Sequence, residues 1–322
     1  MKNILPKAGD KILWIRFSPL GDVLQSGAEA MLFKKRFPDT ELTFLTTTPY
    51  AELVAEQPWC DKVIIGNKRP WAEFKKTLAK IKEEKYDWLI SDNHGGHTAA
   101  LSLFSKIPNT VGTFSMQFMY GESLEKFFAR AGIANKDRKE PSFFAEKEDI
   151  EYAKAVLSKL PDKKLFAIIG ASKEERMWPE ENWRELLKSL LDEGWGVVLS
   201  GSGKREKTVA DKLETILNNP NVFNSVSKFS LKQLLGVVSN CNVAVGNDTG
   251  TLHLAALSGI PTIGLSDCNQ FEWLGLCTPW FIGLCADKTP TKEIHSSHGH
   301  SREKLASITA EEVKEQIEQI CR

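Results

Sequence analysis

The sequence predicts an α/β protein made of two doubly wound domains, each with a parallel sheet. Short apolar runs of strand length alternate with longer amphipathic stretches, which is the pattern of βαβ units. At 322 residues the chain exceeds one ordinary core and suits two domains of about 150 residues each. The alternation is interrupted over 134–163, so we expect a first domain at 1–160 and a second at 161–308. Ligands in such folds bind at the carboxyl ends of the strands, here in a cleft between the domains.

The first half begins with a strand at 11–17, where apolar and aromatic side chains predominate. A helix at 23–37 follows, and Pro38 ends it because proline supplies no N–H group to continue the helix. The alternation then continues with strands at 42–47, 62–65, 87–91 and 109–112, and helices at 50–56, 70–84 and 97–104.

The second half opens with a helix at 147–159. It continues with strands at 165–169, 195–200, 241–245 and 261–265, and helices at 180–193, 203–218, 230–238 and 249–257. The segment 266–305 has no clear periodicity. Thr309 and Glu312 have the spacing of a capping box, which predicts a final helix over 309–322.

Composition excludes several classes of protein. Lys and Arg total 42, as do Asp and Glu, so no net charge favours a nucleic-acid partner. The chain is 42% hydrophobic and 26% charged, which is typical of a soluble globular protein, and its apolar runs are too short to span a membrane. The first residues lack a secretory signal, and the six cysteines are widely spaced, so we expect a cytoplasmic protein with reduced thiols.

The most informative segment is 247–254, Asn-Asp-Thr-Gly-Thr-Leu-His-Leu, which links a buried strand to a helix. The first N–H groups of a helix lack partners, and the helix dipole favours negative charge there. Asp248 suits a cap, Thr249 and Thr251 add hydroxyl groups, and Gly250 lets a phosphate approach the backbone. An ordinary Asp cap does not account for the small residues and His253, so we interpret this segment as a pyrophosphate site.

Other loops at strand ends leave two interpretations open. Asp22, after Ser18-Pro-Leu-Gly21, is a general base at the cleft or simply a helix cap. Arg176 offers a cation for a phosphate, or belongs to a solvated charged loop with two neighbouring Glu residues. Glu206, in the loop that starts at Gly201, binds a nucleoside or complements its helix dipole.

Two groups of residues raise the question of metal binding. The loop 91–97 contains Asp92, His94 and His97, and a plain polar loop explains it better than a metal site. Cys268, Cys277 and Cys285 with three later histidines lack the close spacing of a zinc knuckle. We therefore expect no metal ion and no cofactor.

These loops, in this order, resemble those of glycosyltransferase family 9, the bacterial heptosyltransferases of the lipopolysaccharide inner core. The motifs that carry the resemblance are Ser18-x-x-Gly21-Asp22-Val-Leu, Trp178-Pro179, the loop 201–206, and Asp248-Thr-Gly-x-x-His253-Leu-Ala-Ala. The resemblance implies a GT-B fold, with two Rossmann-like doubly wound domains facing a central cleft. It also implies that the helix at 309–322 packs back on the N-terminal domain.

Carried over by position, the resemblance makes Asp22 the catalytic base. The donor would be bound by Arg176, Glu206, Asp248, Thr249, Gly250, Thr251 and His253. Arg176 replaces the usual lysine, and Thr251 stands where relatives are often apolar. Acceptor contacts fall to Ser18, Gly21, Lys68, Arg69, Asp92 and His94, the last in place of a usual Gln.

The implied reaction is an inverting, metal-independent transfer of heptose from ADP-heptose to Kdo–lipid A or the inner core of lipopolysaccharide (lipooligosaccharide). We expect the lysine-rich region 62–85 and the apolar segment 114–120 to face this glycolipid at the cytoplasmic surface of the inner membrane. A solvated helix face also explains 70–85. Two other functions stay open: a GT-B transferase for another nucleotide-diphosphate sugar, and an inactive nucleotide-sugar-binding protein.

Overall fold

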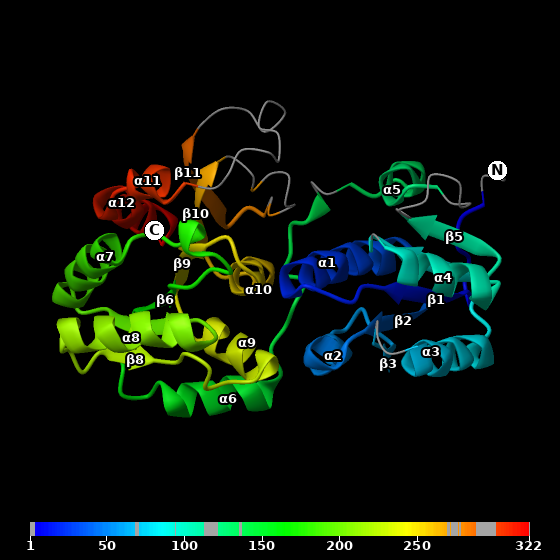
Figure 1. The fold of residues 1–322 in the computed structure, drawn as a ribbon, viewed down its shortest axis with the longest axis horizontal. Coiled ribbons are helices and arrows are strands. Elements are labelled where there is room, and N and C mark those ends of the chain that lie inside the picture. The colour runs from blue at the N-terminus through cyan, green and yellow to red at the C-terminus, as the bar shows by residue number, and fades with distance from the viewer. Residues whose placement is uncertain are drawn as a thin grey trace. The chain divides into compact units, whose positions relative to one another are not determined.

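The computed structural model describes residues 4–67, 71–93, 95–112, 122–134, 137–268, 271, 276, 278–287 and 301–321. It divides into two compact units, Met1–Arg138 (unit 1) and Lys139–Arg322 (unit 2). Each contains a parallel sheet between helices (Figure 1), so the predicted fold class is confirmed. The boundary follows Arg138 rather than residue 160, because helix α6 (Lys147–Val156) packs against α9 (Leu231–Ser239) of unit 2.

Unit 1 is a five-stranded sheet in the order β3-β2-β1-β4-β5, and all of its pairs are parallel. Its elements are β1 (Lys11–Ile15), α1 (Leu20–Arg36), β2 (Glu41–Thr46), α2 (Thr48–Ala55), β3 (Lys62–Ile65), α3 (Trp71–Glu84), β4 (Trp88–Ser91), α4 (Gly96–Ser105), β5 (Asn109–Gly112) and α5 (Leu124–Ala131).

The alternation of β1 separates the two faces of this sheet. Leu13 and Ile15 pack with residues of α3 and α4 such as Phe74 and Leu101. Trp14 points the other way, and its ring meets Phe33 of α1 at 5.7 Å between centroids. A sheet covered on both faces needs apolar residues at every strand position, which explains why β1 reads as a continuous apolar run.

Unit 2 is a six-stranded parallel sheet in the order β11-β10-β9-β6-β7-β8. After α6 its elements are β6 (Lys164–Ile168), the 3₁₀ turn η2 (Glu174–Arg176), α7 (Glu180–Asp192), β7 (Gly196–Ser200), α8 (Lys204–Leu217), β8 (Val222–Asn224), α9, β9 (Val243–Asn247), α10 (Gly250–Ser258), β10 (Thr262–Cys268), β11 (Phe281–Asp287), α11 (Arg302–Ala306) and α12 (Ala310–Ile320).

Alternate strand residues divide the core of unit 2 into two clusters. Leu165, Ala167 and their neighbours pack with α7, α8 and α12, whereas Phe166 and Ile168 pack with α6, α9 and α10. The helices therefore cover both faces of the sheet, and the loops after β6, β7 and β9 emerge together at its carboxyl edge.

The C-terminal helix α12 belongs to the core of unit 2. It lies beside α7 (Figure 1), and its buried Ala310, Val313 and Ile317 join the same core cluster as Trp183. The apolar stripe of α12 is therefore covered within unit 2, and its packing on the first domain stays a prediction. The predicted capping box between Thr309 and Glu312 is confirmed.

Four short elements escaped the sequence analysis: α5, β8, β11 and α11. Each has eight residues or fewer, too few for periodicity to stand out. α5 did carry local signals, since Ser123 caps its start and Gly132 ends it in the left-handed conformation. Within the described ranges, no helix combines the length and apolarity that crossing a bilayer requires.

Gly246 lies where β9 closely approaches its neighbour β6. A Cβ atom there would lie 2.3 Å from Cβ of Ile168, its partner in β6. We expect Gly246→Ala to lower the free energy of unfolding by about 1–3 kcal/mol through overpacking, measured by urea denaturation. Gly96→Ala is the control, because a Cβ at Gly96 meets nothing within 4 Å; equal stability of both variants would contradict the crowding.

Candidate functional site

Three charged or polar side chains meet at the carboxyl edge of the unit 2 sheet. Asp248 directly follows β9, and its Oδ1 lies 3.3 Å from Nε2 of His253 on α10. Its other oxygen, Oδ2, lies 3.9 Å from Nη1 of Arg176, which ends the turn η2. The structure thus brings together three residues that the sequence analysis predicted to bind the donor. The Asp248 carboxylate lies between the Arg176 guanidinium and the His253 imidazole.

Helix α10 begins beside this group with an open end. Its N-cap is Thr249, whose side chain makes no capping hydrogen bond. The Thr249 hydroxyl is buried and has no hydrogen-bond partner among the described residues. Gly250 and Thr251 form the first turn, where N–H groups have no acceptors within the helix. These donors suit an anion, because the dipole of α10 adds to them. Thr249, rather than Asp248, occupies the cap position.

Asn247 is a site residue that the sequence analysis missed. It is fully buried at the end of β9, and its Oδ1 accepts a hydrogen bond from the N–H of Trp178 at 2.8 Å. Its Nδ2 donates to the carbonyl of Gly170 at 3.2 Å. One amide therefore joins both ends of the loop that carries Arg176 to the end of β9, which Asp248 follows. The signal was an Asn at the end of an apolar strand, where a buried amide needs partners on both sides.

Glu206 lies at the same edge, in the first turn of α8. A Cβ atom at Gly170 would lie 2.4 Å from its Cγ, and one at Gly201 would lie 2.7 Å from its Cβ. Both loops thus need glycine so that Glu206 can pack against their backbones. The carbonyl of Gly170 also accepts a hydrogen bond from Asn247. The same loop residue therefore contacts Glu206 and the end of β9, which Asp248 follows.

In unit 1, Asp22 occupies the first turn of α1, with 45% of its side chain exposed. Its Oδ2 forms an ion pair with Arg16, which follows β1 directly. Arg16 also lies 3.2 Å from Oδ2 of Asp92, which follows β4. The structure therefore joins Asp22 and Asp92 through an arginine that the sequence analysis did not single out.

Two partly buried carboxyl groups near α1 have raised pKa values. Burial raises the pKa of Asp92, against the opposing effect of Arg16. Burial also raises the pKa of Glu29 to about 8, and the Asp92 carboxylate adds to this shift. Glu29 lies 3.9 Å from Arg138, the last residue of unit 1. At neutral pH most Glu29 side chains therefore hold a proton.

The remaining predicted acceptor residues divide into two groups. Ser18 precedes Pro19 through a cis peptide bond, and Gly21 is the second residue of α1, so both lie beside Asp22 in the chain. Lys68, Arg69, His94 and the segment 114–120 lie outside the described residues.

The structure also bears on the metal question. His97 is in α4, where its ring packs edge-on against Phe17 and Phe74 at 5.1 and 5.3 Å between centroids. Of the Cys/His group, Cys268 and Cys285 are described, and the others lie outside. Across the described ranges, no three potential metal-ligating side chains form a cluster.

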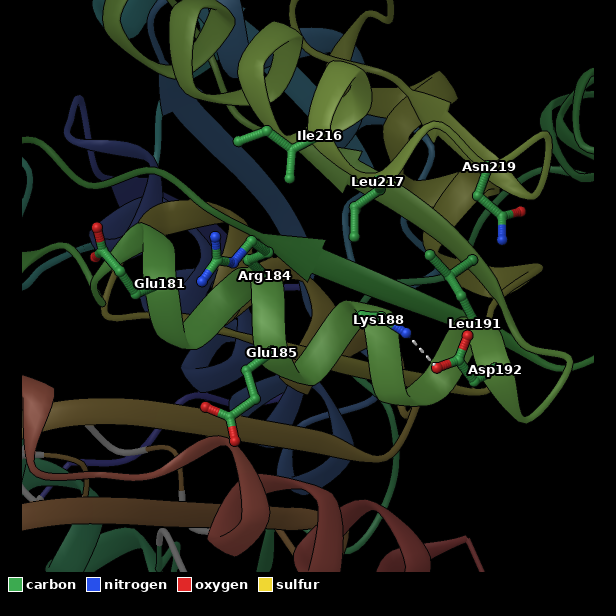
Figure 2. A pocket seen from close by; sticks show the side chains of 9 residues that line it. All are labelled: Glu181, Arg184, Glu185, Lys188, Leu191, Asp192, Ile216, Leu217 and Asn219. Carbon is green, nitrogen blue, oxygen red and sulfur yellow. Dashed lines mark hydrogen bonds and ion pairs between the residues drawn. The ribbon is translucent and has the colours of Figure 1, made fainter.

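A cavity of about 550 Å³ lies elsewhere in unit 2, between α7 and the end of α8 (Figure 2). Within its lining, Lys188 pairs with Asp192 at 2.7 Å, while Ile216 and Leu217 reach toward α7 from α8. None of the predicted site residues lines it. We therefore place the candidate site at the sheet edge, where polar groups converge, and not at this cavity.

Comparison with known proteins identifies the relatives of this chain. Residues 122–272 match the model of glycosyltransferase family 9 (heptosyltransferase). The chain is 23% identical over 280 residues to lipopolysaccharide core heptosyltransferase OpsX of Haemophilus influenzae, covering 81% of this chain and 80% of that protein.

Solved structures resemble the whole chain. A glycosyl transferase family 9 protein from Veillonella parvula has a TM-score of 0.85 at 19% identity, covering 99% of both chains. The ADP-heptose lipopolysaccharide heptosyltransferase II of E. coli has a TM-score of 0.77 at 20% identity, covering 97% of this chain and 98% of that one. The fold is thus the GT-B fold that the resemblance implied.

The role of Asn247 can be tested through stability. Asn247→Ala leaves the buried N–H of Trp178 without its acceptor, so we expect a loss of about 1–3 kcal/mol in the free energy of unfolding. The matched control is Asn242→Ala. Asn242 is exposed and accepts from the N–H of Lys164 at 2.8 Å, and water can replace that bond. We expect a change below about 0.5 kcal/mol there; similar losses in both variants would contradict the special role of Asn247.

Proposed function

We propose that this chain, of which residues 122–272 match glycosyltransferase family 9, transfers heptose from ADP-heptose to the Kdo or inner-core region of lipopolysaccharide or lipooligosaccharide. The names of its relatives, a lipopolysaccharide core heptosyltransferase and an ADP-heptose lipopolysaccharide heptosyltransferase, support this donor and acceptor. The observation that carries the proposal is the convergence of Arg176, Asp248 and His253 beside the open start of α10.

In this proposal the donor diphosphate binds at the start of α10. The N–H groups of Gly250 and Thr251 and the hydroxyl of Thr249 donate to its oxygens, and Arg176 supplies a positive charge. Asp248 and His253 contact the sugar, and Glu206 accepts hydrogen bonds from the nucleoside. As negative charge grows on the leaving diphosphate, the helix dipole and Arg176 stabilise it without a metal ion.

Asp22 acts as the general base. It takes the proton of the acceptor hydroxyl while that oxygen bonds to the anomeric carbon and the bond from this carbon to the diphosphate breaks. ADP leaves in the same step, so the anomeric configuration inverts. The exposed position of Asp22 on the first turn of α1 supports access to an acceptor, and Ser18 and Gly21 are proposed to line the same acceptor site.

We propose that unit 1 presents the acceptor side to the cytoplasmic surface of the inner membrane. Trp71 is 61% exposed at the start of α3, and its ring stacks on Phe74 with centroids 4.6 Å apart. Phe74 contacts the half-exposed Phe104 of α4. Exposed apolar rings beside Lys75 and Lys76 suit an anionic lipid surface. Lys68, Arg69 and His94 extend this proposed acceptor surface.

The central test is calorimetric titration of ADP, UDP and GDP into wild type and Asp22→Asn. We expect ADP to bind at least about tenfold more tightly than the others, or about 1.4 kcal/mol, in both proteins. The variant should lose about 10²–10⁴-fold in kcat for heptose transfer. Equal binding of all three nucleotides would favour another donor, and binding without transfer in wild type would indicate an inactive binding protein.

The acceptor surface is tested by charge reversal. Lys75→Glu with Lys76→Glu should raise the KM for Kdo–lipid A about tenfold, because each cation near an anionic surface contributes about 1 kcal/mol. The affinity for ADP should not change. Lys188→Glu with Lys207→Glu is the matched control, since those exposed lysines lie on α7 and α8 of unit 2. Unchanged acceptor kinetics in the first variant would remove the surface from the proposal.

A further inference from the structure

The guanidinium group of Arg16 is fixed from several directions. Its side chain is 11% exposed, and Nη2 pairs with Oδ2 of Asp22. Nη1 donates to the backbone carbonyl of Asp92 at 2.8 Å and lies 3.2 Å from Oδ2 of the same residue. A planar guanidinium held at two nitrogens has a defined orientation. Arg16 therefore presents Nη2 to Asp22 from a fixed position.

Asp92 is itself held by the helix that carries Asp22. Ser26, about one turn further along α1, donates from its hydroxyl to Oδ1 of Asp92 at 3.0 Å. The same hydroxyl accepts from Nε1 of the fully buried Trp14 at 2.8 Å. The chain of contacts runs from Trp14 through Ser26, Asp92 and Arg16 to Asp22. It joins the ends of β1 and β4 to the start of α1.

The charges in this group cancel. Arg16 and Arg138 carry two positive charges, and Asp22 and Asp92 carry two negative ones. The fifth ionisable group, Glu29, is protonated and neutral at neutral pH because burial raises its pKa to about 8. Arg16 thus divides one positive charge between two carboxylates. Within the described residues, Oδ1 of Asp22 receives no hydrogen bond, so this oxygen is open to a substrate.

We propose that Arg16 and Asp92 are positioning residues for the transfer reaction. Arg16 holds the Asp22 carboxylate by one oxygen, and Asp92 takes up part of the guanidinium charge, so that the other oxygen of Asp22 stays basic enough to accept the proton of the acceptor hydroxyl. The inference rests on the proposed role of Asp22 as the base. It assigns Asp92 to the support of Arg16 rather than to direct contact with the acceptor.

The experiment measures transfer from ADP-heptose to Kdo–lipid A across pH. In Asp92→Asn the full charge of Arg16 acts on Asp22, which then binds a proton less strongly. We expect the acid limb of the kcat profile to move to lower pH and the plateau to fall about tenfold or more. In Arg16→Met the attraction is lost, so the acid limb should move to higher pH. A merely structural role does not produce shifts in opposite directions.

Controls separate this inference from the proposed function. Calorimetric affinity for ADP should stay within twofold in each variant, because the proposed donor site lies in unit 2. Asp92→Glu restores the charge and should return the acid limb toward its wild-type position. If Asp92→Asn does not fold, as judged by thermal unfolding, Arg16→Lys and Arg16→Met are compared, and only Arg16→Met should move the limb.

Two outcomes distinguish a failure of the proposed base from a failure of the positioning role. Full turnover by Asp22→Asn would show that the base is another residue and would overturn the proposed role of Asp22. An inactive Asp22→Asn, together with wild-type profiles for Asp92→Asn and Arg16→Met, would leave the base in place and overturn the positioning role alone.

Discussion

The arrangement of the candidate donor site depends on the buried amide of Asn247. This amide joins the end of β9 to both ends of the nine-residue segment from Gly170 to Trp178, which carries Arg176. Arg176 in turn lies 3.9 Å from Asp248, which follows β9. The amide has a donor and an acceptor at a fixed separation, so it can bond Gly170 and Trp178 at once. Neither a carboxylate nor an aliphatic side chain of similar size offers both groups, which makes this position chemically restrictive.

In unit 1 the loops and the helix are joined by ion pairs, where unit 2 uses the neutral amide of Asn247. Arg16 connects the first turn of α1 to the end of β4, and Ser26 closes the arrangement from the same helix. Buried ions are costly unless each has partners. Here the guanidinium has two carboxylates and a carbonyl, and Glu29 avoids an excess negative charge by keeping its proton. The candidate residues of each unit are therefore held by polar groups that are bonded on more than one side.

The sequence was sufficient to predict the alternating elements and the loops that carry chemistry, because period and turn residues are local properties. It placed the strand before the phosphate motif at 241–245, whereas β9 runs from Val243 to Asn247. Asn is rare in strands, so its place at the end of β9 depended on partners far along the chain. Arg16 was also missed, because a cation after an apolar strand is usually expected to be solvated. Its ion pairs with Asp22 and Asp92 form only in the folded chain.

The spacing of 3.9 Å between Arg176 and Asp248 has a consequence for selectivity. In this state the resting protein already supplies the cation with a negative neighbour of its own. A small free anion such as inorganic phosphate must compete with that carboxylate and gains few contacts in return. A nucleotide sugar at the proposed donor site would gain base, ribose and sugar-ring contacts besides, so the Asp248 carboxylate would favour large ligands over abundant small anions.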